Sequence, residues 1–373
     1  MSEKIIGAAK PRIDGPQKLT GRAKYSSDNN LPGMVYAYGV FSTIARGEIT
    51  NIDTRVAKQS PGVIDIFHHN HFPKLYHTPS SMAQENKVDE VRLPFEDNKV
   101  YYAGQFVALV VADTFENARA AAYKVRVDYQ KSAAIANLDQ AVERNGSKMQ
   151  KKSNHTRGNP EEAYGNAAKT IDATYYTPVE THNPMEMHAT VAAWNDGKLT
   201  MYDTTQGVVN ACNVYAKVFG LSPDRVEVLT PFLGSGFGSK LWPWPNAIAA
   251  AAAAREIGRP VQLVVPRQEM FTTTGHRPET RQRMRLGTDD AGRLVSLRHE
   301  TIYTTSTVDQ VDTYVESCGK MTQGLYSCDN LSVTHAAART NRGTPTSMRA
   351  PGAAPGMFAL ESAMDEMAEQ LGM

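Results

Sequence analysis

An α+β fold with mixed sheets and packed helices is predicted by three features of this 373-residue chain. Strand–helix–strand order near the N-terminus places helices on a sheet. Two tight turns, at residues 194–198 and 289–292, each join strand-like runs and predict antiparallel hairpins. The alanine run 249–254 lies in a helix with little amphipathicity, so we expect that helix to be wedged between other elements.

The amino-terminal part is expected to be a compact α/β unit. Asp113 and Glu116 predict a capping box for a helix that runs to Tyr123. The stretch 148–160 is polar, basic and without periodicity, and is the best linker candidate. The other predicted elements are a helix over 54–59 and strands over 63–67, 106–111 and 125–129.

The second part is expected to combine two hairpins with three longer helices. The second hairpin pairs residues 280–286 with 293–299. Helices are predicted over 208–219, closed by Gly220, over 246–257, closed by Gly258, and over 355–371. The last helix carries an apolar stripe that is typical of a core-facing side, formed by Met357, Leu360, Met364, Met367 and Leu371.

Composition excludes several classes of function. Forty Lys and Arg residues balance thirty-nine Asp and Glu residues, so there is no charge footprint for nucleic acid. No apolar run approaches the roughly 18 residues of a membrane span, and the N-terminus is too short and polar for a signal peptide. Cys212, Cys318 and Cys328 are expected to be reduced thiols, since an iron–sulfur cluster generally needs four protein ligands.

The most informative segment is the glycine loop, residues 231–240, with the sequence PFLGSGFGSK. It follows the strand-like run 225–230 and precedes the alanine-rich helix, a position where loops bind anions or cofactors. Leu241 follows Lys240 where a P-loop needs Ser or Thr, and Ser239 replaces the third glycine of a dinucleotide motif. A tight turn between strand and helix is the alternative interpretation.

A second candidate site contains His182, Glu186 and His188. A helical zinc pair needs histidines four positions apart, but these are six apart with Pro184 between them. We therefore expect Glu186 and His188 to form a buried hydrogen-bonded pair on one side of a strand.

Three ordered segments closely resemble the molybdenum-cofactor subunit of the xanthine dehydrogenase and aldehyde oxidase family. They are the glycine loop, residues 204–207 (TTQG) at a hairpin end, and residues 347–356 (SMRAPGAAPG) before the last helix. The resemblance is nearest to bacterial aldehyde oxidases with separate molybdenum, flavin and iron–sulfur subunits, and it covers only the amino-terminal half of the usual subunit. It implies an α/β-hammerhead domain over 14–130, a linker over 131–160 and the first half of the cofactor-binding domain over 161–373.

The resemblance also implies roles for particular residues. Gln206 matches a glutamine that reaches an oxygen ligand of molybdenum, Phe237 matches a loop whose N–H groups approach those ligands, and Arg349 matches an arginine beside the cofactor. The loop glycines would be needed because a Cβ would collide with the cofactor. Pterin sulfurs hold the metal, so no direct protein ligand is expected. The implied cofactor-binding residues are Gln206, Gly207, Gly236, Phe237, Gly238 and Arg349.

Two departures from the family pattern bear on the substrate. Leu241 replaces a glutamate of purine-hydroxylating members, and Pro351 replaces a phenylalanine. Leu241, Trp242 and Trp244 then predict an apolar pocket mouth, which favours aldehydes over purines. Leu241, Trp242 and Pro351 are the expected substrate-pocket residues. No catalytic residue is assigned, because the family's glutamate base would lie beyond Met373.

The resemblance implies a molybdenum-cofactor-binding polypeptide of a molybdo-flavo iron–sulfur hydroxylase. It would oxidise aldehydes or N-heterocycles with water as the oxygen source, using molybdopterin or its cytosine dinucleotide form. Partner subunits would carry [2Fe–2S] clusters and FAD, and the absent carboxy-terminal half or a second chain would complete the cofactor cleft. A cytoplasmic location is expected, or a periplasmic one if a partner carries an export signal. The alternatives are a non-catalytic half-subunit and a phosphate-binding NTPase.

Overall fold

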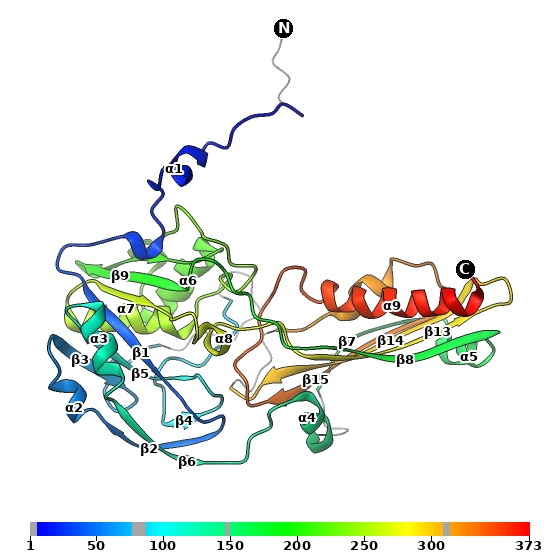
Figure 1. Ribbon diagram of the computed structural model, residues 1–373, viewed down its shortest axis with the longest axis horizontal. Helices are drawn as coiled ribbons and strands as arrows, with labels where there is room; N and C mark the ends of the chain where they lie inside the picture. The colour runs from blue at the N-terminus through cyan, green and yellow to red at the C-terminus, as the bar shows by residue number, and fades with distance from the viewer. Residues whose placement is uncertain (1–5, 77–86, 146–149, 309–313) are drawn as a thin grey trace, which may run out of the picture.

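The computed structural model describes residues 6–76, 87–145, 150–308 and 314–373, and it divides into two regions (Figure 1). The larger region contains a seven-stranded and a three-stranded sheet, and the narrower region contains a five-stranded sheet with a long helix along it. Parallel and antiparallel pairs occur within one sheet, so the predicted α+β fold with mixed sheets is confirmed.

The seven-stranded sheet joins parts of the chain that the sequence assigned to different domains. Its order is β11-β10-β9-β12-β1-β5-β3, with β1 parallel to β12. The predicted boundary over 131–160 therefore does not separate two sheets. The strands are β1 (Val35–Phe41), β3 (Val63–His68), β5 (Phe106–Ala112), β9 (Ala189–Asn195), β10 (Lys198–Asp203), β11 (Val226–Leu229) and β12 (Val261–Val264).

Helices of the larger region match the sequence predictions closely. α6 (Val208–Phe219) ends at Gly220 and α7 (Pro245–Ile257) ends at Gly258, and both glycines have a left-handed backbone with φ of 68° and 69°. The six alanines 249–254 are all buried, and α7 packs against β9 and β12, so the wedged position is confirmed. The remaining helices are α2 (Arg55–Lys58), α3 (Phe115–Ala122) and α8 (Met270–Thr273).

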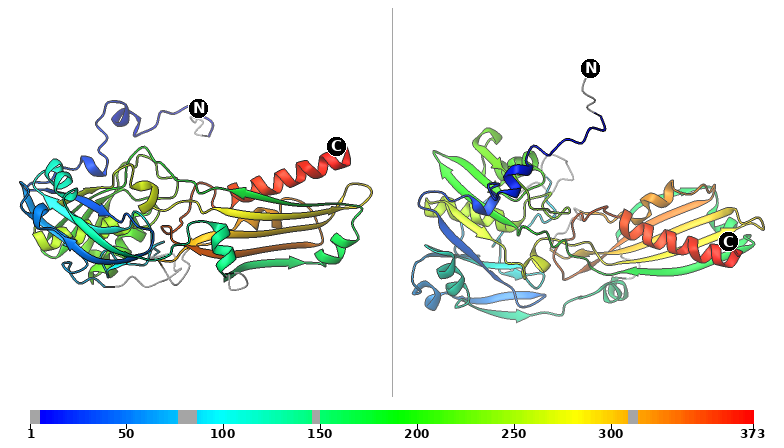
Figure 2. Two further views of the ribbon diagram at one scale, coloured as in Figure 1. Left: turned by 60° about the horizontal axis from the view of Figure 1, so that its bottom comes forward. Right: turned by 45° about the horizontal axis from the view of Figure 1, so that its top comes forward.

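The five-stranded sheet carries α9 (Ala353–Leu371) on one face (Figure 2). Leu360 and Met367 of α9 are buried against Met284 and Leu297, as the apolar stripe predicted. The sheet order is β7-β15-β14-β13-β8. These strands are β7 (Gln150–Arg157), β8 (Lys169–Thr177), β13 (Thr280–Thr288), β14 (Leu294–Ser306) and β15 (Leu331–Thr340), and the three-stranded sheet contains β2 (Gly47–Asp53), β4 (Lys99–Val100) and β6 (Arg126–Lys131).

Two local predictions are wrong. The N-cap of α3 is Thr114, whose side chain accepts the N–H of Asn117, so the capping box from Asp113 to Glu116 does not form. The supposed linker contains α4 (Leu138–Asn145) and β7, which pairs with β15 at the sheet edge. A polar, basic composition suits an edge strand as well as a linker, which explains the error. Positions 148 and 149 lie outside the described residues.

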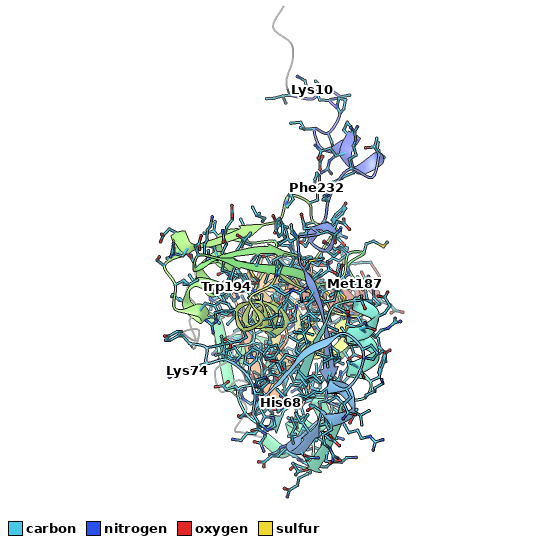
Figure 3. All side chains as sticks on the ribbon, turned by 90° about the vertical axis from the view of Figure 1, so that its left-hand side faces the viewer. Lys10, His68, Lys74, Met187, Trp194 and Phe232 are labelled. Carbon is cyan, nitrogen blue, oxygen red and sulfur yellow. The ribbon has the colours of Figure 1, made fainter. Side chains whose placement is uncertain are left out.

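The N-terminal segment extends away from the larger region, with Lys10 near its outer end (Figure 3). Its helix α1 (Gly15–Leu19) buries none of its residues. At its base, the Phe232 ring of the glycine loop lies 6.1 Å from the Tyr25 ring and 5.7 Å from Lys18 Nζ. Residues 1–5 lie outside the described part, and no described helix is long and apolar enough to cross a membrane.

Candidate functional site

The three motif segments meet in the structure. The glycine loop connects β11 to α7, and its Gly238 N–H donates to Oε1 of Gln206 at 3.0 Å. On the other side, the N–H of Arg349 donates to the carbonyl oxygen of Phe237 at 2.8 Å. These two contacts bring Gln206, Phe237 and Arg349 together, as their implied roles beside one cofactor require.

Each glycine of the loop makes room for a different segment of the protein. A Cβ added at Gly234 would lie 2.5 Å from Cβ of Glu186, one at Gly236 would lie 2.4 Å from Oε1 of Gln206, and one at Gly238 would lie 2.0 Å from the carbonyl oxygen of Ser347. Contacts this short force a shift of the neighbouring atoms. Protein atoms therefore already favour glycine at these three positions, independently of any cofactor.

The backbone of the site is strained. Ser235 and Phe237 in the glycine loop have φ of 70° and 54°, and Ala350, next to Arg349, has φ of 58°. Left-handed conformations are uncommon for residues with a Cβ and gather at ligand-binding positions. The strain therefore makes both loops candidates for a ligand-binding site.

The outward side of the site presents hydrogen-bond donors. Gln206 and Arg349 are exposed, and Phe237 is 42% exposed. Because Oε1 of Gln206 accepts from Gly238, its amide nitrogen remains as the donor. In the described chain the N–H groups of the exposed Phe237 and of the buried Gly236 beside it make no hydrogen bond to other residues. An amide, free backbone N–H groups and a guanidinium fit a ligand rich in oxygen atoms.

Beneath the glycine loop lies a connector, residues 178–188, which joins β8 to β9. Oε2 of Glu186 accepts from the N–H of Gly234 at 2.8 Å and from Nζ of Lys240 at 3.0 Å. His188 instead pairs through Nε2 with the carbonyl oxygen of Ser239 at 3.2 Å, and burial lowers its pKa to about 3. The predicted hydrogen bond between Glu186 and His188 is therefore wrong, because these residues precede β9 and do not share the face of a strand.

The connector also supports the arginine loop, residues 344–352. Arg277 is 4% exposed, and it donates through Nη2 to the carbonyl oxygen of Arg349 at 2.8 Å while its Nε lies 2.8 Å from Oε2 of Glu180. His182 pairs through Nε2 with the carbonyl oxygen of Ser347 at 2.9 Å. Sequence reasoning missed Arg277 and Glu180, since neither stands in a motif and their partners are distant in sequence.

The predicted pocket residues do not all lie at an entrance. Leu241 and Trp242 are half-buried and Pro351 is exposed. Trp244, however, is 3% exposed, and its indole N–H donates to the carbonyl oxygen of Ser239 at 2.7 Å. Its expected place at the pocket mouth is therefore wrong. It packs beneath the glycine loop because that position buries its apolar ring and gives its N–H a hydrogen-bond acceptor.

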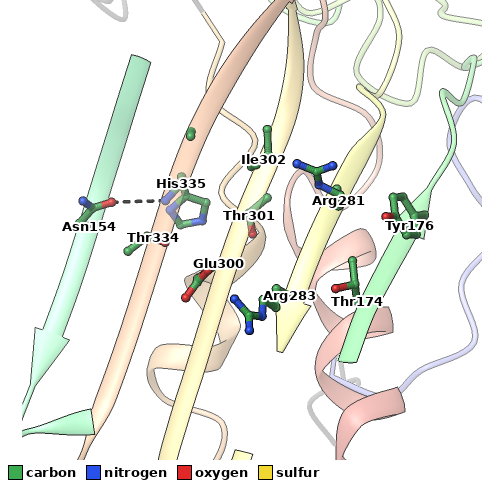
Figure 4. Close-up of a pocket in the computed structure, with 11 residues that line it drawn as sticks. Asn154, Thr174, Tyr176, Arg281, Arg283, Glu300, Thr301, Ile302, Thr334 and His335 are labelled. Atoms are coloured by element: carbon green, nitrogen blue, oxygen red, sulfur yellow. Dashed lines mark hydrogen bonds between the residues drawn. The ribbon is translucent and has the colours of Figure 1, made fainter. Parts of the chain in front are cut away.

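A separate pocket of about 580 Å³ lies on the five-stranded sheet (Figure 4). It is lined by side chains such as Arg281, Arg283 and Glu300, and Arg283 there donates to Asp172 at 2.7 Å. None of its lining residues belongs to the glycine or arginine loop. Among the described residues, no group of His, Cys, Asp and Glu side chains could hold a metal ion. The donor chemistry places the candidate site at the two loops.

Comparison with known protein families agrees with this placement. The molybdopterin cofactor-binding domain matches residues 142–373, which include Gln206 and both loops. The a/b hammerhead domain of aldehyde oxidase and xanthine dehydrogenase matches residues 20–133. Together the two matches cover most of the chain.

Individual relatives are about twice as long as this chain. The aldehyde oxidoreductase molybdenum-binding subunit PaoC of Escherichia coli K12 is 35% identical over 99% of this chain and 49% of its own length. The structure of aldehyde oxidoreductase from Desulfovibrio gigas superposes with a TM-score of 0.84 at 26% identity, over 98% of this chain and 42% of that chain. Quinoline 2-oxidoreductase from Pseudomonas putida 86 shares the fold, with a TM-score of 0.88 at 24% identity over 98% and 48% of the two chains. The chain thus belongs to the aldehyde oxidase and xanthine dehydrogenase family and comprises its hammerhead domain and the start of its molybdopterin-binding domain.

Proposed function

We propose that the glycine loop, the arginine loop and Gln206 bind a molybdenum cofactor in an enzyme that oxidises aldehydes. The observation that carries this proposal is the meeting of Gln206, Phe237 and Arg349 in one donor-rich surface. When bound, the cofactor supplies the two-electron redox chemistry and the metal that activates water. The residues of this chain hold and orient it.

The family resemblance and the observed hydrogen bonds together support each proposed contact. The amide nitrogen of Gln206 would donate to an oxygen ligand of the metal, since its Oε1 already accepts from Gly238. The N–H groups of Gly236 and Phe237 would donate beside it, and Arg349 would neutralise anionic charge on the pterin or its phosphate. Gly207 adjoins Leu241, whose carbonyl oxygen would lie 3.2 Å from a Cβ at Gly207.

The substrate and partners are also part of the proposal. Leu241, Trp242 and Pro351 offer apolar surface and few polar groups, which suits an aldehyde better than a purine. The similarity to a protein named as a subunit supports assembly with other chains, and the family resemblance implies that these carry iron–sulfur clusters and FAD as electron acceptors. The proposed cofactor is molybdopterin or its cytosine dinucleotide form, and no residue of this chain is assigned as the general base.

The test is the cofactor content of variants purified with their partner chains. Gln206→Ala and Arg349→Ala each remove one donor, and a hydrogen bond to a charged group is worth about 1.5–3 kcal/mol. Bound molybdenum and pterin should therefore fall roughly tenfold or more at limiting cofactor. Arg283→Ala, in the separate pocket on the five-stranded sheet, is the matched control and should retain both. Equal losses in all three variants would contradict the proposed site.

A further inference from the structure

The connector, residues 178–188, is the common support of the two loops. It contains no helix along its described length, and its only strand-like contact there is a bridge between Glu180 and Arg277. Nevertheless, each of its ionisable side chains contacts one loop or a residue that holds it. Glu186 and His188 contact the glycine loop, whereas His182 and Glu180, through Arg277, support the arginine loop. A segment without regular structure is held here by polar contacts.

One carboxylate oxygen accepts hydrogen bonds from two separate positions of the glycine loop. Oε2 of Glu186 accepts from Gly234 at 2.8 Å and from Nζ of Lys240 at 3.0 Å, and Nζ also donates to the carbonyl oxygen of Glu186 at 2.9 Å. Lys240 is 1% exposed, and the side chain of Glu186 is 10% exposed. Hydrogen bonds between charged groups are strengthened by such low-dielectric surroundings.

Between these two anchored positions lies the strained part of the loop. Ser235 and Phe237, the left-handed residues, fall inside the span from Gly234 to Lys240. Such a conformation persists only where surrounding contacts determine it. The buried pair supplies such contacts at both ends of this span, whereas Phe237 within the span is exposed.

We propose that Glu186 and Lys240 are positioning residues that hold the glycine loop in its ligand-binding conformation. This inference rests on the proposed function, because it assigns the loop conformation a role in cofactor binding. Neither side chain reaches the exposed surface of the site, so both act through the loop backbone. Their ion pair sets where the N–H groups of Gly236 and Phe237 point.

Hydrogen–deuterium exchange of the purified chain tests the loop conformation without any cofactor. Glu186→Gln keeps the side-chain size but removes the charge, which leaves the Lys240 cation buried and unpaired. Exchange in peptides covering 231–240 should rise at least about tenfold, as expected for the loss of a charge-assisted hydrogen bond. Exchange in α7 and β12 should stay unchanged. Asp172→Asn, which removes a carboxylate paired with Arg283 on the five-stranded sheet, is the matched control.

Gly234→Ala provides a second route to the same result. Gly234 does not have a left-handed backbone, so alanine is compatible with its conformation, but its Cβ would lie 2.5 Å from Cβ of Glu186. The displaced Glu186 should release the loop and raise exchange over 231–240 in the same way. The inference is wrong if exchange over 231–240 is unchanged in both Glu186→Gln and Gly234→Ala. It is also wrong if exchange there rises no more than it does in the control Asp172→Asn.

Pterin content separates this inference from the proposed function. In the complex purified from a host that makes the cofactor, Lys240→Met should lose pterin about tenfold, whereas Lys240→Arg should retain more because it keeps the charge. Equal pterin loss in Lys240→Arg and Lys240→Met would count against the ion pair. A wild-type complex without pterin would refute the proposed function. Exchange over 231–240 in Glu186→Gln would still show whether Glu186 holds the loop conformation.

Discussion

At the scale of single residues, the motif of the glycine loop shows where glycine is needed but not which neighbouring atoms require it. The sequence correctly singled out Gly236 and Gly238 as positions that need glycine. It did not reveal the reason, because the colliding atoms belong to Gln206 and to Ser347, which lie far away along the chain. Local pattern predicts that two backbones approach closely, but only the fold identifies the partner.

Gly238→Ala should destabilise the protein. Its Cβ would lie 2.0 Å from the carbonyl oxygen of Ser347, and its φ of 111° is unfavourable for any residue with a Cβ. Backbone strain of this kind costs about 1–3 kcal/mol, which denaturant unfolding can measure. Gly165→Ala is the control, since nothing lies within 4 Å of its Cβ position and its φ is not positive. A smaller loss in Gly238→Ala than in the control would contradict the close approach of the two loops.

His299 should make stability depend on pH. Burial lowers its pKa to about 3, below the unfolded value of about 6.5, so its stabilising effect is present above pH 6.5 and is lost as pH falls toward 3. His299→Gln removes this titration, while an amide can still pair with Thr322 and Gln282. Between pH 4 and 6, the unfolding free energy of the wild type should rise with pH more steeply than that of the variant. The two slopes should differ by about 1.4 kcal/mol per pH unit. Parallel curves for the two proteins would contradict this.

At the scale of elements, helix ends and hairpins were predictable and an edge strand was not. Gly220 and Gly258 end α6 and α7 as expected, because a left-handed C-cap is a local requirement. β7 was not predicted because its strand conformation depends on pairing with β15, which lies more than 170 positions away in every pair. Tertiary pairing, not local sequence, therefore determines this element.

Ala251→Leu tests whether α7 is wedged as tightly as its burial indicates. Ala251 is fully buried, and its carbonyl oxygen accepts the indole N–H of Trp194 at 2.8 Å. Added methylenes in such a packed position cost about 1–3 kcal/mol of unfolding free energy. Glu256→Leu on the same helix is exposed and should change stability by less than about 0.5 kcal/mol. Similar thermal midpoints for both variants would show that space exists around the helix.

At the scale of the whole molecule, family membership could be predicted from the order of three motifs, but the support beneath them could not. The contacts of Lys240, Arg277 and Glu180 join segments that no sequence pattern relates. The shared seven-stranded sheet likewise links the hammerhead segment to the cofactor-binding segment through β1 and β12. The site is therefore built on one continuous scaffold.

Substrate preference should follow the apolar character of Leu241. Each polar group of a purine that is buried without a partner costs about 1–3 kcal/mol, so several together suppress turnover by a few orders of magnitude. The complete complex should therefore oxidise an aromatic aldehyde with a far higher kcat/KM than hypoxanthine. Leu241→Glu should narrow that difference, because a carboxylate can pair with the purine. Comparable efficiencies on both substrates in the wild-type complex would contradict the assigned pocket.

Residues 1–373 expressed alone should bind the cofactor weakly and show no turnover. Gln206, Phe237 and Arg349 are exposed in this chain, which spans about half the length of relatives such as the Escherichia coli subunit. A ligand held on an open surface stays in contact with water, where each hydrogen bond contributes only about 0.5–1.5 kcal/mol. We therefore expect substoichiometric molybdenum and no aldehyde oxidation with a dye acceptor.

The full-length Escherichia coli relative, produced in the same cofactor-making host, is the control for cofactor supply. If residues 1–373 bind stoichiometric molybdenum and oxidise aldehydes, the general base lies within this chain and the proposed division of roles is wrong. If they bind the metal without turnover, the two loops suffice for binding. The remaining half of the longer relatives would then account for the chemistry, because the exposed donors described here can orient a cofactor but cannot exclude water from it.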